Sequence, residues 1–452
     1  SKAIIFSTFL ESGLKKVPKI TYNIRCCLIT SASRHMKATF IKVKLAYISS
    51  HKGVNMRAMP STAVKAHNRS AMTQYLYGHS HVTKQELERE LGLSLPTITQ
   101  NLRALEDDGL IRKGKLQDST GGRKAQNYEF NPDHRTAIGV VMRSNELRLC
   151  AINLYGNVIE KRNDALPYRN TNVYYQRIGG IINNFAADVE KKHGKVLGVS
   201  FAIQGILSPD ATTIIFGTIM GNTGLTLETI SQSVHYPCMM IHDSDASAMA
   251  ELWFDSTLTD AVCVYLERRP GGAVIAGGKL YQGPNQCNGA IEHMTLVPGG
   301  RECYCGQRGC MDTYCSPETL PEDYESIPGF FSVLEQGERH HRERMDEWLD
   351  YVAQAIVNAR SIIAGDVIVG GEAAQHLEDS DIEDLKTRVI ARSPFGTDHF
   401  NLRKSYCAED QNIIGAALRF AENYLDGICG AAERGRKSKA STKSDNTSTM
   451  EV

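Results

Sequence analysis

The spacing of apolar residues changes character along the chain. From Ala66 to Asp108 apolar residues recur at helical intervals, and after Pro132 they form short runs rich in β-branched residues. Two such runs, 137–141 and 147–154, flank a polar turn and predict a hairpin. Further strand-like runs cover 196–203, 238–241, 262–266, 273–276 and 367–369. Strands alternating with helical patterns over roughly 300 residues predict an α/β body with at least one large sheet.

The helical region before this body carries the start and stop signals of a helix-turn-helix. Thr83 precedes Glu86 by three residues, which forms a capping box, and Gly92 suits the left-handed end of a first helix. Ser94 can cap a second helix, and Pro96 fits its first turn. The predicted buried stripe of that second helix is Ile98, Leu102 and Leu105.

The opposite face of the second helix is predicted to read DNA bases. It presents Thr97, Gln100 and Arg103, with Thr99 at its edge. Beyond Gly109, two short strand-like segments flank a basic turn, which predicts a wing with Arg123 and Lys124 at its tip, against phosphates or in a minor groove. The alternative is a helix pair that serves only protein contacts.

Charge is distributed unevenly although the formal net charge is zero. Residues 1–135 carry 22 Lys and Arg against 10 Asp and Glu, which leaves 29 against 41 for the rest from totals of 51 each. A basic front suits contact with a polyanion, and a solvated face is the alternative.

Composition is ordinary for globular proteins, with 42% hydrophobic residues. Without a long apolar run or a secretion signal, we expect a cytoplasmic protein with no membrane segment and no disulfides.

One histidine and three closely spaced cysteines predict a metal site. Its ligands would be His293, Cys303, Cys305 and Cys310. Two glycines between the cysteines let the backbone curl, and four soft or borderline ligands suit a closed, structural Zn²⁺ site. The alternative is a set of buried free cysteines beside an unrelated histidine.

From about Lys65 to Leu425 the chain resembles the ROK family, which contains bacterial sugar kinases and sugar-responsive repressors. The most specific match is the family's zinc signature, a Gly-His element followed by Cys-x-Cys-Gly-x-x-Gly-Cys, although Glu292 replaces the glycine before His293. The front end resembles the repressor branch, down to the Gly-Gly-Arg sequence at 121–123. The resemblance implies a winged helix followed by a two-lobed body with the ribonuclease-H-like fold of actin and hexokinase.

The resemblance also implies that two glycine-rich turns hold nucleotide phosphates, and both turns are altered here. The first turn, Asp-x-Gly-Gly-Thr in the family, instead offers Val141, Arg143, Ser144 and Asn145. The second turn contains Glu267, which repels phosphate, and Pro270, which has no N–H to donate. We therefore predict no catalytic residues and no ATP-dependent kinase activity.

The sugar-binding residues implied by the resemblance are partly retained. His242 and Asp243 match the family's Asn-Asp pair, and Asp312 matches a second acidic position, whereas Ala290 replaces a sugar-binding glutamate. The alternative role of Asp243 is to cap a strand-to-helix junction. We predict that His242, Asp243 and Asp312 contact a sugar or sugar phosphate.

Together these patterns predict four segments. Residues 1–60 are assigned no fold and are expected to form a flexible arm, residues 61–131 form the winged helix-turn-helix, residues 132–430 form the ROK body with its zinc site, and residues 431–452 form a disordered tail. The predicted protein is a homodimeric or homotetrameric repressor of sugar-metabolism genes that binds a double-stranded DNA operator and responds to a sugar or sugar phosphate. The alternatives are an ATP-dependent sugar kinase fused to a DNA-binding domain, and a repressor relieved by a protein partner.

Overall fold

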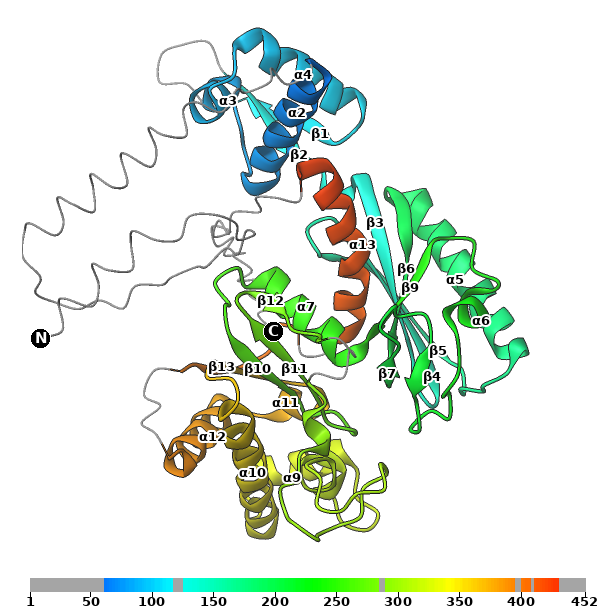
Figure 1. Ribbon diagram of the computed structural model, residues 1–452, viewed down its shortest axis with the longest axis vertical. Coiled ribbons are helices and arrows are strands. Elements are labelled where there is room, and N and C mark those ends of the chain that lie inside the picture. Colours follow the sequence, from blue (N-terminus) through cyan, green and yellow to red (C-terminus); the bar gives the residue numbers. More distant parts are fainter. Residues whose placement is uncertain (1–60, 117–124, 284–288, 395–399, 408–409, 431–452) are drawn as a thin grey trace, which may run out of the picture. The chain divides into compact units, whose positions relative to one another are not determined.

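The computed structural model describes residues 61–116, 125–283, 289–394, 400–407 and 410–430 (Figure 1). The predictions for residues 1–60, for the tail 431–452 and for Arg123 and Lys124 lie outside these segments. Within the described residues, no helix is both long enough and apolar enough to cross a bilayer.

The first described unit is a winged helix-turn-helix. Its elements are α2 (Ser61–Gly78), α3 (Lys84–Leu91), α4 (Leu95–Asp107), β1 (Ile111–Leu116) and β2 (Gln126–Phe130). The Thr83 side chain accepts from the Glu86 amide and the Glu86 side chain accepts from the Thr83 amide, so the predicted capping box is confirmed. Gly92 ends α3 with a φ of 63°, and Ser94 caps α4. The antiparallel strands β1 and β2 are the two predicted wing strands.

The body opens with a five-stranded sheet. Its strands are β3 (Arg135–Met142), β4 (Glu146–Asn153), β5 (Val158–Ala165), β6 (Lys195–Ile203) and β9 (Cys238–His242). The spatial order is β5-β4-β3-β6-β9, in which β3, β4 and β5 pair antiparallel and β3, β6 and β9 pair parallel. The predicted hairpin is therefore confirmed, with Arg143 to Asn145 in its turn.

A second five-stranded sheet repeats this topology. Its strands are β10 (Ala261–Tyr265), β11 (Gly271–Ala276), β12 (Lys279–Leu280), β13 (Asp366–Gly370) and β14 (Leu402–Lys404). The order is β12-β11-β10-β13-β14, again with an antiparallel meander followed by two parallel strands. Two copies of one strand order in one chain define the two-lobed, actin- and hexokinase-like body.

Helices cover both sheets. α13 (Gln411–Cys429) packs on β3, β4 and β6 and on α7 (Asp243–Phe254), as Figure 1 shows. This contact needs glycines, because a Cβ at Gly139 would collide with the Ile413 carbonyl and one at Gly415 would collide with the Ala246 carbonyl. The other helical and short strand elements are α5 (Asn172–Lys192), α6 (Leu227–Ser231), α8 (Asp312–Cys315), α9 (Ile327–Glu335), α10 (Arg339–Arg360), α11 (Glu372–His376), α12 (Asp379–Arg392), η2 (Pro132–His134), η3 (Ile291–His293), η4 (Pro317–Thr319), β7 (Ile206–Leu207) and β8 (Ile214–Phe216).

The end of α2 contacts the turn that follows β4. The Tyr77 hydroxyl donates to the Leu154 carbonyl at 3.2 Å, and the Tyr155 hydroxyl donates to the Tyr77 carbonyl at 3.3 Å. The two rings lie 5.1 Å apart and both contact the ring of Phe130. Burial raises the pKa of Tyr155 to about 12. The winged helix and the first lobe thus share apolar packing and hydrogen bonds.

Candidate functional sites

One face of α4 is buried in the core, and the opposite face is polar. Ile98, Leu102 and Leu105 are buried, as predicted. Thr99, Gln100 and Arg103 are exposed, whereas Thr97 is half-buried and its hydroxyl lies 2.9 Å from that of Ser94. The exposed face is therefore centred on Thr99, Gln100 and Arg103, and Thr97 lies at its edge.

The long side chain on this face is weakly held. Arg103 is 85% exposed, and its nearest carboxylate is that of Asp107 at 4.0 Å. An exposed ion pair of this kind is worth at most about 1 kcal/mol. The guanidinium can therefore turn to a base edge or a phosphate at little cost to the fold.

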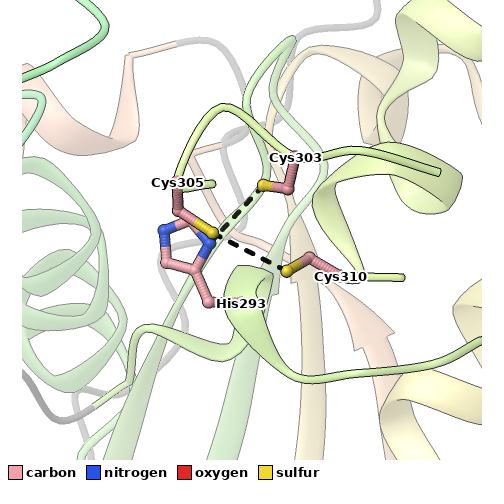
Figure 2. A group of neighbouring side chains, drawn as sticks. All are labelled: His293, Cys303, Cys305 and Cys310. Carbon is pink, nitrogen blue, oxygen red and sulfur yellow. Dashed lines mark hydrogen bonds between the residues drawn. The ribbon is translucent and has the colours of Figure 1, made fainter. Parts of the chain in front are cut away.

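The four predicted metal ligands converge (Figure 2). One ligand atom from each of His293, Cys303, Cys305 and Cys310 lies within 4.8 Å of the others. The sulfurs of Cys305 and Cys310 are 3.8 Å apart, and Cys303 Sγ is 3.7 Å from His293 Nδ1. Tetrahedral zinc with Zn–S distances of about 2.3 Å would separate two sulfurs by about 3.8 Å. The cluster can therefore hold a metal ion.

The surroundings of the cluster favour ligands in the form that a metal requires. Burial lowers the pKa of His293, so its imidazole is held neutral, and Nε2 lies 3.2 Å from the Tyr304 hydroxyl. With Nδ1 turned to the cysteines, Nε2–H can donate to Tyr304, which fixes the ring. Burial raises the pKa of the Cys303 thiol to about 12, so a thiolate there needs a cation beside it.

Next to this cluster lies a cleft, and His293 and Tyr304 are among the residues that line it. Residues from both lobes line it. The polar and charged side chains of the lining are Gln204, Thr218, His242, Asp243, Ser244, Ser247, Tyr265, Glu267, Arg269, Glu292, His293, Tyr304 and Asn412.

Two of the three predicted sugar contacts lie in the cleft. His242 ends β9 and Asp243 begins α7, and the His242 Nε2 atom is 3.4 Å from the Asp243 carboxylate. One Asp243 oxygen also accepts from the Ser244 amide at 2.8 Å. The N-cap position of α7 is His242, so Asp243 is the first helical residue and not the cap of the alternative interpretation, and it lines the cleft.

The third predicted contact is set back from the cleft. Asp312 is 1% exposed and is not among the described lining residues. Its carboxylate accepts from Arg269 at 3.2 Å, and Arg269 is itself a lining residue.

Glu292 is a lining residue whose role the sequence did not indicate. It lies in the turn η3 and is 9% exposed, and its Oε2 atom has no hydrogen-bond partner among the described residues. Burial raises the pKa of Glu292 to about 7. The one signal in the sequence was a glutamate where the resemblance leads one to expect glycine.

The two altered turns meet across the cleft. Arg143, in the β3–β4 turn, places its guanidinium 3.7 Å from the carboxylate of Glu267, in the β10–β11 turn. Burial raises the pKa of Glu267, and the charge of Arg143 opposes this shift. An ion pair therefore joins the two turns, and Pro270 in the second turn has no N–H that could donate to a phosphate.

The fold and these sites define a class of protein, namely a winged helix-turn-helix joined to a two-lobed, sugar-kinase-like body. A sequence model of the ROK family matches residues 137–422, and a winged helix-turn-helix DNA-binding model matches residues 74–112. The first match covers more than half of the chain, so this protein belongs to the ROK family.

Individual relatives include regulators and kinases. The chain is 26% identical over 263 residues to the DNA-binding transcriptional dual regulator NagC of Escherichia coli K12, which covers 57% of this chain. The aligned part spans 64% of NagC, a little less than two thirds of its length.

Two solved structures share the fold. One is a ROK family transcriptional regulator, homologous to the E. coli MLC protein, with a TM-score of 0.65, 16% identity and coverage of 81% of this chain and 98% of that one. The other is a ROK family glucokinase from Streptomyces griseus in complex with glucose and AMPPNP, with a TM-score of 0.54, 19% identity and coverage of 63% and 98%.

Proposed function

We propose that this protein is a sequence-specific DNA-binding repressor of sugar-metabolism genes that responds to a sugar or sugar phosphate and has no kinase activity. The observation that carries the proposal is that two features occur in one chain. Helix α4 presents an exposed polar face, and the two turns that correspond to the family's phosphate-binding turns are joined by an ion pair. The relative NagC is a transcriptional regulator, which agrees with this proposal.

DNA recognition is assigned to the winged helix. Gln100 can pair with adenine and Arg103 with guanine in a major groove, and Thr99 can contact either base or a thymine methyl. Thr97 would contribute from the edge of the face, and Arg123 and Lys124 would contact the backbone or the minor groove. The winged helix would comprise residues 61–131 and the sensor body residues 132–430.

The cleft is proposed to bind the effector without transferring a phosphoryl group. Phosphoryl transfer needs a carboxylate to position Mg²⁺ and donors to cradle the phosphates. At this point the chain offers Arg143 paired with Glu267, together with a proline. His242 and Asp243 remain as sugar contacts, and Asp312 would support them through Arg269.

The cysteine cluster is proposed to bind Zn²⁺ as a structural ion. His293, Cys303, Cys305 and Cys310 would complete a tetrahedral set, which leaves no open position for a reacting water. The ion would cross-link the chain segment that runs from η3 to the start of α8. Since His293 and Tyr304 also line the cleft, the metal would hold one wall of the effector site in place.

A homodimer or homotetramer would present two winged helices to the two halves of a pseudo-palindromic operator. Effector binding would change their relative placement and weaken operator binding. The test is a titration of an operator found by genomic footprinting, with and without a panel of sugars and sugar phosphates. Weaker operator binding with at least one member is expected, and unchanged affinity across the panel would remove the sensor role.

A further inference from the structure

The cleft holds more acid than base. Its described lining contains three carboxyl side chains, Asp243, Glu267 and Glu292, but the guanidinium of Arg269 is the single arginine or lysine group among these residues. Glu267 is paired with Arg143, and Arg269 is paired with Asp312, so among the described residues Asp243 and Glu292 are the lining carboxyl groups without an arginine or lysine partner. A ligand with two negative charges would therefore enter a site whose charge has the same sign.

Arg269, the arginine of the described lining, is already engaged. Arg269 donates to the carboxylate of Asp312 at 3.2 Å and lies 5.4 Å from the centre of the Tyr304 ring. Asp312 is 1% exposed, so turning Arg269 toward a phosphate would leave a buried carboxylate without its partner. Arg269 is thus poorly suited to receive a phosphate ester.

The helix N-terminus at the cleft is also closed to anions. α7 begins at Asp243, whose side chain accepts from the Ser244 amide at 2.8 Å. A second carboxylate of the same turn, Asp245, is 2% exposed and accepts from Gln282. These carboxylates offset the positive end of the helix dipole that would otherwise attract a phosphate.

Glu292 indicates the class of ligand that the cleft accepts. The residue lines the cleft and is 9% exposed, yet its Oε2 atom is buried and has no hydrogen-bond partner among the described residues. Buried oxygens of this kind are costly when unpaired, so such an atom in a binding cleft indicates a ligand that completes it. A sugar hydroxyl or amine is a donor with the required chemistry.

We propose that the cleft binds an unphosphorylated sugar, with its hydroxyl or amino donors on Glu292 and Asp243, and rejects the phosphate ester of the same sugar. This inference rests on the proposed function, because it names the class of effector that the sensor body accepts. Glu292 is then a specificity-determining residue of the cleft.

The first test uses the unsubstituted full-length protein and matched pairs of ligands. Glucose, N-acetylglucosamine and mannosamine are each compared with the corresponding 6-phosphate by calorimetric titration at one ionic strength. For the pair that binds, the free sugar is expected to bind at least roughly tenfold more tightly, because like charges brought together cost several times the thermal energy. Equal or tighter binding of the phosphate ester would overturn the proposal.

The second test addresses Glu292 directly. Glu292→Gln keeps the shape and removes the anionic acceptor, so the affinity for the free sugar is expected to fall roughly tenfold or more. Glu335→Gln makes the same chemical change at an exposed position at the end of α9 and serves as the matched control. Wild-type sugar affinity in a folded Glu292→Gln protein would overturn the role of this residue, and the matched-pair test does not depend on that variant.

Different results would contradict the preference for an unphosphorylated sugar and the sensor function itself. If a phosphate ester binds more tightly and releases the operator, this inference is wrong and the sensor function stands. If no free or phosphorylated sugar alters operator affinity or binds to the protein, the sensor function is wrong and the inference is overturned with it.

Discussion

Replacing Arg103 by alanine removes the longest side chain from the exposed face of α4. In the structure this guanidinium is 85% exposed and its ion pair with Asp107 spans 4.0 Å. Loss of such a surface contact should change the free energy of unfolding by about 0.5 kcal/mol or less. Loss of a bidentate contact to guanine should cost operator binding about 1–3 kcal/mol, or roughly 5- to 150-fold in affinity.

The assay is fluorescence anisotropy at one salt concentration, with the footprinted operator and a scrambled duplex of equal length. Arg103→Ala should weaken operator binding within that range and reduce the ratio of operator to scrambled affinity. The matched control is Arg339→Ala, because Arg339 is 90% exposed and also pairs with a carboxylate four residues on, that of Glu343. Wild-type operator preference in a folded Arg103→Ala protein would refute the assignment of α4 as the reading helix.

Three further predictions concern the metal site, the body and its junction with the winged helix. Cys310→Ser should abolish stoichiometric zinc binding and lower the melting temperature, as measured by elemental mass spectrometry and calorimetry, and unchanged zinc content would contradict the ligand set. Glu251→Ala should destabilise the body by about 3–5 kcal/mol in urea unfolding. The reason is that this fully buried carboxylate accepts from Arg403 at 2.9 Å. Tyr155→Phe loses the bond to the Tyr77 carbonyl and should cost about 1 kcal/mol of stability. The substitution should also change the effector-induced loss of operator affinity more than it changes the affinity for the effector. Equal changes in these two quantities would contradict a coupling role for this contact.

Local signals in the sequence were sufficient for the winged helix. The Thr83–Glu86 capping box, Gly92 and Ser94 act within a few residues of one another, so the sequence specifies them directly, and all three occur as predicted. The convergence of the four candidate metal ligands was also predictable, because Cys303, Cys305 and Cys310 are close in sequence and His293 is only ten residues away.

The relations that the sequence did not reveal join distant segments. Arg143 and Glu267 are 124 residues apart, and no local pattern indicates that they form an ion pair. The resemblance implied a sugar contact for Asp312, and the sequence did not reveal that this carboxylate is buried and bonded to Arg269, which lines the cleft. Thr97 was expected on the outer face of α4, but the cap at Ser94 engages its hydroxyl.

Glu292 shows why burial must be known before a role can be assigned. In the sequence it was only a departure from an expected glycine, and an exposed glutamate at that position would have no consequence. In the structure its Oε2 atom is buried at the edge of the cleft and lacks a hydrogen-bond partner among the described residues. That combination, and not the residue type, makes it a candidate ligand contact.

The central claim is that ion-paired turns have replaced the phosphate cradle, so the body senses its ligand and does not phosphorylate it. The most direct measurement is calorimetric titration of the full-length protein with ATP and Mg²⁺ in the presence of saturating effector, followed by mass spectrometry of the sugar. We predict no saturable nucleotide binding at millimolar concentrations and no sugar phosphate formed. Micromolar binding of the Mg²⁺–ATP complex with turnover of the sugar would contradict the claim.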